Sequence, residues 1–211
     1  MTVTDDTTAP AQRRAPRIRT DAARNRVRIL AAARETLVEL GPEVPLDEIA
    51  RRAGVGNATV YRHFPDRGAL LHDVLLFVIT RTAEFAEGAA AQQADPFGAL
   101  RGFAHAAVDE RAAAVCGLFT AVEQDGAPED VYAEIGRLRL ALEELMERAR
   151  RAGALRPDVT QHDLMVAISQ LTRPLPGLEC RDTDAHRHLD MFLDGLRPHP
   201  APPATPTPIG P

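Results

Sequence analysis

Apolar residues recur at the spacing of an α-helix along most of the chain, in steps of three and four. The first stripe follows Asp21, which is suited to cap a helix, and ends at Gly41 and Pro42. Its apolar positions are Ile29, Leu30, Ala33, Leu37 and Leu40. This pattern predicts a first helix that begins at Asp21.

Three further stripes precede residue 90. The segment LDEIARRA, residues 46–53, has one apolar face and stops at Gly54. The next helix is predicted to begin at Asn57, as its N-cap, and to run through ATVYRHF. Asp66 then caps a longer helix that continues to about residue 88. The first part of the chain is therefore predicted to contain four helices.

The same periodicity continues beyond residue 90. Asp95 and Pro96 start a block of two predicted helices that ends at Gly126. The strongest stripe follows and stops at Gly153. Its members are Val131, Ile135, Leu138, Leu142, Leu145 and Ala149. Such regular steps indicate a helix with one buried face.

Two last helices are predicted near the C-terminus. One is capped by Thr160, and Pro174 and Pro176 should break or kink it. The other carries Leu189, Phe192, Leu193 and Leu196. No segment shows the alternation typical of a strand. The predicted fold class is therefore all-α, with about nine helices.

The two ends of the chain lack this periodicity. Residues 1–20 are polar with four closely spaced arginines, and we expect a disordered basic arm. Residues 198–211 hold seven of the 17 prolines, and we expect a disordered tail. No segment has the apolar run of a membrane span or of a secretory signal. A soluble, cytoplasmic protein without a membrane partner is expected.

Charge is distributed unevenly along the chain. The formal net charge is -5, which by itself disfavours a nucleic-acid partner. Residues 11–67, however, contain twelve arginines against seven acidic residues, and residues 68–211 contain thirteen against twenty-one. A basic head on an acidic body suits a protein that offers one end to phosphate.

The segment LDEIARRAGVGNATVYRHF meets the requirements of a helix-turn-helix, which we place at about residues 45–64. Ala50 permits the close approach of the two helices, and Gly54 permits a positive φ in the turn. The apolar contacts that lock the pair are Ile49, Val55 and Val60. The second helix would present its N-terminal end to the major groove of DNA.

Four linked segments resemble the DNA-binding domain of the tetracycline-repressor (TetR) family. They are RILAAARETLVELG, LDEIARRAGV, TVYRHF and FPDRGALL, within residues 24–75. The resemblance implies a three-helix DNA-binding domain at residues 21–67. It also implies a helical ligand-sensing and dimerisation domain at residues 68–197.

The resemblance assigns contacts with the DNA backbone to four residues. Thr59 looks like a hydroxyl donor to phosphate or base, and Tyr61 and His63 look like backbone contacts. Packing between helices is the alternative for Tyr61. Arg67 stands where the family usually has a lysine that reaches phosphate, and arginine keeps that charge and adds a second donor.

Base reading is expected from Asn57 and Ala58. Asparagine pairs bidentately with adenine, and alanine contacts the methyl group of thymine. One position departs from the family, because Pro45 stands where many relatives have a serine or threonine that caps the second helix and contacts phosphate. Proline favours helix initiation but donates no hydrogen bond, so one phosphate contact is expected to be missing.

Several residues of the second domain interrupt otherwise aliphatic helices. The candidates for a ligand pocket are Phe103, His105, Cys116, Phe119 and Arg173. Packing in the core is the simpler interpretation of each. Cys116 and Cys180 belong to no CxxC pair, so free thiols are expected.

His186, His188 and Asp190, with Cys180 nearby, raise the question of a metal site. Helical residues two positions apart diverge by roughly 200°, so His186 and His188 cannot share one ion. Only His186 and Asp190 lie on a common face. We therefore expect no bound metal and no cofactor.

The resemblance implies a transcriptional repressor that binds a palindromic operator as a homodimer and is released by a small molecule. The predicted last two helices, about 160–176 and 184–197, would pair with their copies. A ligand-independent regulator and an activator are the alternatives. No nucleophile elbow, phosphate loop or HExxH motif occurs, so an enzyme is not expected.

Overall fold

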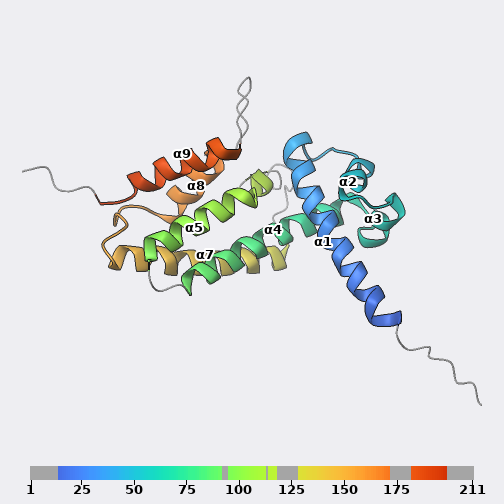
Figure 1. The fold of residues 1–211 in the computed structure, drawn as a ribbon, viewed down its shortest axis with the longest axis horizontal. Coiled ribbons are helices and arrows are strands. Elements are labelled where there is room, and N and C mark those ends of the chain that lie inside the picture. The colour runs from blue at the N-terminus through green and yellow to red at the C-terminus, as the bar shows by residue number, and fades with distance from the viewer. Residues whose placement is uncertain (1–13, 92–94, 113, 118–127, 172–181, 199–211) are drawn as a thin grey trace, which may run out of the picture. The chain divides into compact units, whose positions relative to one another are not determined.

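The computed structural model describes residues 14–91, 95–112, 114–117, 128–171 and 182–198, and every regular element in these ranges is a helix (Figure 1). The helices with defined bounds are α1 (Arg14–Leu40), α2 (Leu46–Ala53), α3 (Asn57–His63), α4 (Arg67–Ala90), α5 (Pro96–Asp109), α7 (Glu129–Arg151), α8 (Gln161–Leu171) and α9 (Asp182–Gly195). Residues 112 and 114–117 are also helical. The all-α prediction is confirmed. No described helix is long and apolar enough to cross a membrane.

The chain forms two compact units, Met1–Phe77 and Val78–Pro211. Helix α4 belongs to both, because residues 67–77 lie in the first unit and residues 78–90 in the second. The sequence analysis placed the boundary at the start of this helix, and the structure places it within the helix.

Helix α1 begins at Arg14, so the expected start at Asp21 is wrong. Residues 14–20, which were expected to be disordered, are helical. Three of these seven residues are arginine and one is alanine, and both are strong helix formers. Pro16 lies in the first turn, where a helix needs no backbone N–H from it. Residues 1–13 lie outside the described ranges.

The core of the first unit holds α1, α2, α3 and the beginning of α4 together. Its buried residues include Ile29, Leu37, Ile49, Ala50, Val60, Phe64, Leu70 and Val74. Val60 and Phe64 are fully buried, so they fix which face of α3 points inward. The Arg26 guanidinium lies 4.9 Å from the centre of the Phe64 ring.

The turn between α2 and α3 has the geometry predicted for a helix-turn-helix. Gly54 has φ 63° and ψ 39°, the left-handed conformation that glycine adopts without steric cost. Arg28 Nη2 donates hydrogen bonds to the carbonyls of Ala53 at 2.8 Å and Gly54 at 3.4 Å. The N-cap of α3 is Gly56, so the prediction of an Asn57 cap is wrong by one residue. Asn57 is instead the first helical residue, and its side chain is exposed.

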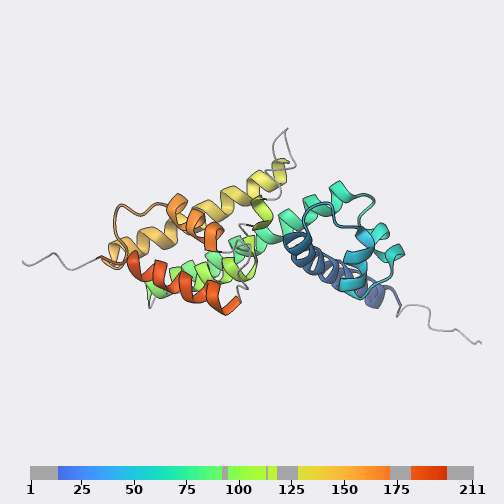
Figure 2. The same ribbon diagram turned by 90° about the horizontal axis from the view of Figure 1, so that it is seen from above.

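The second unit is built from the second part of α4 and from α5, α7, α8 and α9. Figures 1 and 2 both show α9 lying along α5, and α5 also packs against α7 and α8. The shared core includes Leu100, Phe103, Leu142, Leu145, Met146, Leu164, Ile168, Leu189 and Leu193. The strong stripe predicted within residues 131–149 thus packs as one helix, α7.

Three predicted helix starts are confirmed by capping hydrogen bonds. Asp66 accepts one from the Ala69 N–H at 2.7 Å, and Asp95 accepts one from the Gly98 N–H at 2.8 Å. Thr160 and Asp163 bond reciprocally at the start of α8. The predicted breaks at Pro174 and Pro176 lie outside the described residues, as does the tail from residue 199.

Candidate nucleic-acid interface

Helix α3 has one face in the core and the opposite face in solvent. Asn57 and Ala58 are exposed, and Tyr61, one turn later, is 51% exposed. Tyr61 therefore does not pack between helices, which was the alternative considered for it. Thr59 is half-buried beside this face. The residues predicted to meet DNA lie at the surface of a short helix that is anchored from behind.

Arg62 also lies on the exposed face, and the sequence analysis missed it. It follows Ala58 by four residues, so a helical count from Ala58 predicts its position. Among the described residues it has no hydrogen-bond or ion-pair partner. Its guanidinium is therefore free to meet a phosphate or a guanine.

His63 is less accessible than the sequence analysis assumed. Its Nε2 atom is buried and has no hydrogen-bond partner in the described part of the chain. Burial, and then the positive charges of Arg62 and Arg26, lower the pKa of His63. Both effects favour the neutral form of the ring.

Arg67 is bonded to the turn between α1 and α2. Its guanidinium donates to the carbonyl of Pro42, to that of Glu43 at 3.2 Å and to that of Val44 at 2.6 Å. These carbonyls precede the first turn of α2 and have no partner within a helix. The phosphate contact implied for Arg67 stays a prediction, and the structure adds a role in positioning α2.

The two arginines of α2 are neutralised by two carboxylates, one on the same helix and one on α1. Arg51 and Arg52 both donate to Glu48, at 2.6 to 2.9 Å, and Arg52 also reaches Glu39 of α1. These hydrogen bonds lower the pKa of Glu48 to about 2. Pro45 provides no side-chain cap for α2, as predicted. The positive charge offered to DNA by the described head therefore comes from other arginines.

The three predicted ligand residues that the structure describes do not converge on one cavity. Phe103 is buried in the core, which favours the packing interpretation. Burial also raises the pKa of the Cys116 thiol to about 11. His105 is hydrogen-bonded to side chains of α9. Phe119 and Arg173 lie outside the described residues.

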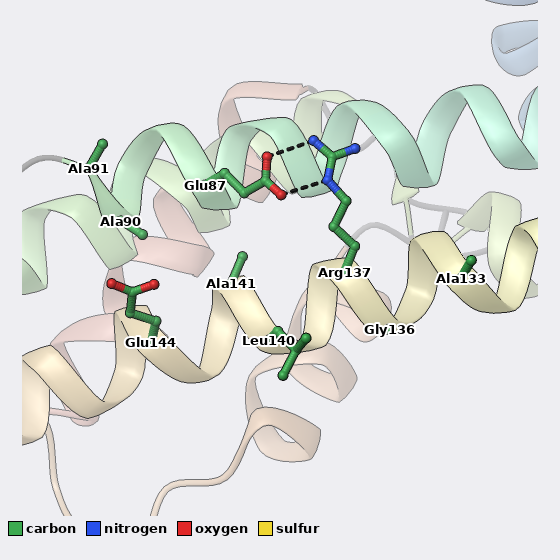
Figure 3. Close-up of a pocket in the computed structure, with 9 residues that line it drawn as sticks. All are labelled: Glu87, Ala90, Ala91, Ala133, Gly136, Arg137, Leu140, Ala141 and Glu144. Atoms are coloured by element: carbon green, nitrogen blue, oxygen red, sulfur yellow. Dashed lines mark hydrogen bonds and ion pairs between the residues drawn. The ribbon is translucent and has the colours of Figure 1, made fainter.

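An open groove of about 780 Å³ lies between α4 and α7 (Figure 3). It is lined by Glu87, Ala90, Ala91, Ala133, Gly136, Arg137, Leu140, Ala141 and Glu144. Arg137 donates two hydrogen bonds of 2.6 Å to the Glu87 carboxylate, one to each oxygen. The small residues leave this space open. Of the predicted ligand residues that the structure describes, which are Phe103, His105 and Cys116, none lines the groove.

The all-helical fold and the exposed face of α3 together define a DNA-binding protein of the helix-turn-helix class. Residues 29–74 match the family model described as bacterial regulatory proteins, tetR family. Residues 95–198 match the model described as transcriptional regulator SbtR-like, C-terminal domain. The chain belongs to the TetR family of DNA-binding transcriptional regulators.

Solved structures agree with this assignment. SCO0520 of Streptomyces coelicolor, a TetR transcriptional regulator, is 33% identical over 82% of this chain and 98% of its own, with a TM-score of 0.62. A TetR transcription regulatory protein of Mycobacterium vanbaalenii is 36% identical over 85% of this chain and 99% of its own, with a TM-score of 0.59. LfrR of Mycobacterium smegmatis, solved with proflavine, shares the fold at 23% identity over 84% and 99%, with a TM-score of 0.56. No curated protein is significantly similar to the chain.

Arg62 and Arg67 should respond differently to replacement by alanine. Arg62→Ala should leave the thermal midpoint unchanged and reduce the slope of log affinity against log salt by about 0.9, because one phosphate charge is no longer neutralised. Arg67→Ala should lower the thermal midpoint by about 2–4 °C for each kcal/mol lost, because three turn carbonyls lose their donors.

Calorimetry and a salt series of DNA titrations measure both quantities. An Arg67→Ala protein as heat-stable as the wild type would contradict the role in the turn. A salt slope that also falls for this variant would show that Arg67 contacts phosphate as well.

Proposed function

We propose that the protein is a repressor that binds a palindromic operator as a homodimer through α3 and is released by a small molecule. The observation that carries the proposal is the exposed face of α3, where Asn57, Ala58, Tyr61 and Arg62 lie together. Such a face fits the major groove, which admits one α-helix.

Each residue on this face has a distinct part in the proposal. Asn57 reads adenine and Ala58 contacts a thymine methyl group. Thr59 and Tyr61 donate from their hydroxyl groups to phosphate, which fixes the register of the helix on the duplex. Arg62 adds the charge that makes binding depend on salt.

The operator is expected in DNA upstream of the protein's own gene. Titration of a fluorescent fragment of that DNA should show tight binding that weakens with salt. Asn57→Ala should reduce the affinity for this fragment by about 1–3 kcal/mol and leave the affinity for random DNA unchanged, because it removes a base contact. Tyr61→Phe should weaken binding to both.

Tyr132→Phe is the matched control, because Tyr132 is 58% exposed on α7 and far from α3 in sequence. Binding that is equally weak to the upstream fragment and to random DNA would count against this operator. Equal losses of DNA affinity in Tyr61→Phe and Tyr132→Phe would count against the contact assigned to the Tyr61 hydroxyl.

The proposed dimer interface lies on α8 and α9. These helices bury Leu164 and Ile168, and Leu189 and Leu193, in the core of the unit. They also carry large apolar residues on their outer sides, because Val166 is 42% exposed and Met191 is 63% exposed. Two neighbouring helices with exposed apolar residues suit pairing with a second copy in a four-helix arrangement.

Replacing Met191 by glutamate should convert the dimer into a monomer of 22.9 kDa, because the charge would be buried between the two copies. Light scattering coupled to size-exclusion chromatography measures the mass. Leu140→Glu is the control, since Leu140 is 76% exposed but lies on α7. A Met191→Glu protein that remains dimeric would contradict this interface. So would a Leu140→Glu protein that becomes monomeric.

The groove between α4 and α7 is the proposed effector site. It is the space that Figure 3 shows beside Gly136 and Ala141, and α4 continues from its wall into the DNA-binding unit. An effector there would act by moving α4. A hundredfold loss of operator affinity requires only about 2.7 kcal/mol of coupling between the two sites. LfrR, which has the same fold, was solved with a small molecule, proflavine.

Gly136→Leu should fill the groove, because no atom lies within 4 Å of a Cβ at this position. The variant should bind the operator normally but need about tenfold more effector for release. The effector used is a compound selected from a library by its release of the wild-type protein from DNA.

Gly102→Leu on α5 is the control, because its Cβ also meets no atom within 4 Å and lies outside the groove. Normal release of Gly136→Leu by the selected compound would place the effector site elsewhere.

A further inference from the structure

Two histidines from different helices face each other where α5 packs against α9. The Nδ1 atoms of His105 and His186 are 2.7 Å apart. The ring planes differ by 23°, and the ring centres are 4.9 Å apart. The distance between the ring centres is longer than the distance between the two Nδ1 atoms. The difference is about what is expected if each Nδ1 lies on the line that joins the two ring centres. The rings therefore meet edge to edge, with the Nδ1 of one directed at the Nδ1 of the other.

The outer nitrogen of each ring contacts a carboxylate. His105 Nε2 lies 3.0 Å from Asp190 Oδ1, and His186 Nε2 lies 2.9 Å from Asp109 Oδ1. An ionised carboxylate only accepts hydrogen bonds, so both Nε2 atoms must carry a hydrogen. The contact between the Nδ1 atoms needs one hydrogen more. Three hydrogens on two rings correspond to one neutral imidazole and one imidazolium.

We propose that His105 and His186 bind one proton between them, and that α9 is held most firmly against α5 when the pair carries this single proton. Without it, two lone pairs face each other, or one Nε2 loses its hydrogen bond to a carboxylate. With a second proton, two N–H groups face each other. Both changes weaken the contact between the helices.

Among the described residues, the charged groups that bond to the pair come from the same two helices. Arg101 of α5 donates to Asp190 at 2.7 Å and also to Asp194 of α9. Asp190 therefore accepts hydrogen bonds from His105 and from Arg101, which keeps it ionised. Because the ionised Asp190 carboxylate carries no hydrogen, the hydrogen between the two rings belongs to one of the imidazoles.

The other helices packed against α5 and α9 contribute mainly apolar side chains to the shared core. From α7 these are Leu142, Leu145 and Met146, and from α8 they are Leu164 and Ile168. The titratable residues of α8 are His162 and Asp163 in its first turn, where Asp163 bonds to Thr160.

A proton fits the space between the rings better than a metal ion does. Zinc binds imidazole nitrogens at about 2.0–2.1 Å, and tetrahedral geometry would hold two such nitrogens about 3.3 Å apart. The separation of 2.7 Å is too short for a bridging zinc ion and lies at the short end of the range for an N–H donor, as in hydrogen bonds that carry a charge.

The pair also bears on regulation if the dimer proposed above exists. Helix α9 is one of the two helices assigned to that interface, so a proton that fixes α9 would stabilise the assembly. This consequence rests on the proposed function, whereas the shared proton itself is independent of it.

Nuclear magnetic resonance of the full-length protein with ¹⁵N-labelled histidine tests the shared proton directly, without DNA. Over some range between about pH 5 and 8, where histidine changes charge, both Nε2 signals should be protonated and both Nδ1 signals should lie between the protonated and unprotonated positions. Two rings that are both neutral or both fully protonated at every pH would overturn the proposal.

Thermal unfolding of a variant supplies the second test. His186→Gln should lower the thermal midpoint by about 2–4 °C at the pH where the pair holds one proton, and by less on either side. His188 is exposed on the same helix and serves as the control. His188→Gln should lower the thermal midpoint only slightly, and by the same amount at every pH. A loss from His186→Gln that does not vary with pH would contradict the proposal. The resonance test uses the wild-type protein and stands even if this variant does not fold.

Discussion

The orientation of α3, whose exposed face is the proposed DNA-reading surface, depends on two arginines that bond to the turns at the two ends of α2. Arg28 of α1 donates to the carbonyls of Ala53 and Gly54, at the C-terminal end of α2. Arg67 of α4 donates to carbonyls that include that of Val44, which precedes α2. Buried or turn carbonyls without a partner cost free energy, so these bonds favour one orientation of α2. Because α3 begins at Asn57, three residues after Gly54, its direction depends on the same contacts.

Local features of the first unit were predictable because their causes are local. Glycine at a left-handed turn position, as at Gly54, and capping side chains, as at Asp66, act within a few residues. The start of α1 was not predictable from Asp21, since good helix formers continue before it and no residue there ends the helix. The partners of Arg67 lie more than twenty residues away, so no sequence pattern indicates them.

The second unit shows the same limit more strongly. Phe103 and His105 both interrupt an aliphatic helix, yet one is a core residue and the other belongs to a polar contact with α9. Sequence spacing correctly placed His186 and Asp190 on one face, but only the packing of α5 against α9 brings His105 between them. The groove between α4 and α7 results from small residues on two helices, and alanine and glycine carry no signal of a cavity. Tertiary packing decides each of these cases.

We propose that a homodimer reads a palindromic sequence through the exposed face of α3. Selection of bound duplexes from a pool of random sequences by the wild-type protein is the measurement that decides this. One inverted repeat should be enriched, with half-sites separated by about 34 Å or a multiple of this helical turn. The same selection with Asn57→Ala should lose the preference at one position of each half-site. Enrichment of no sequence, or of a single unrepeated site, would contradict it.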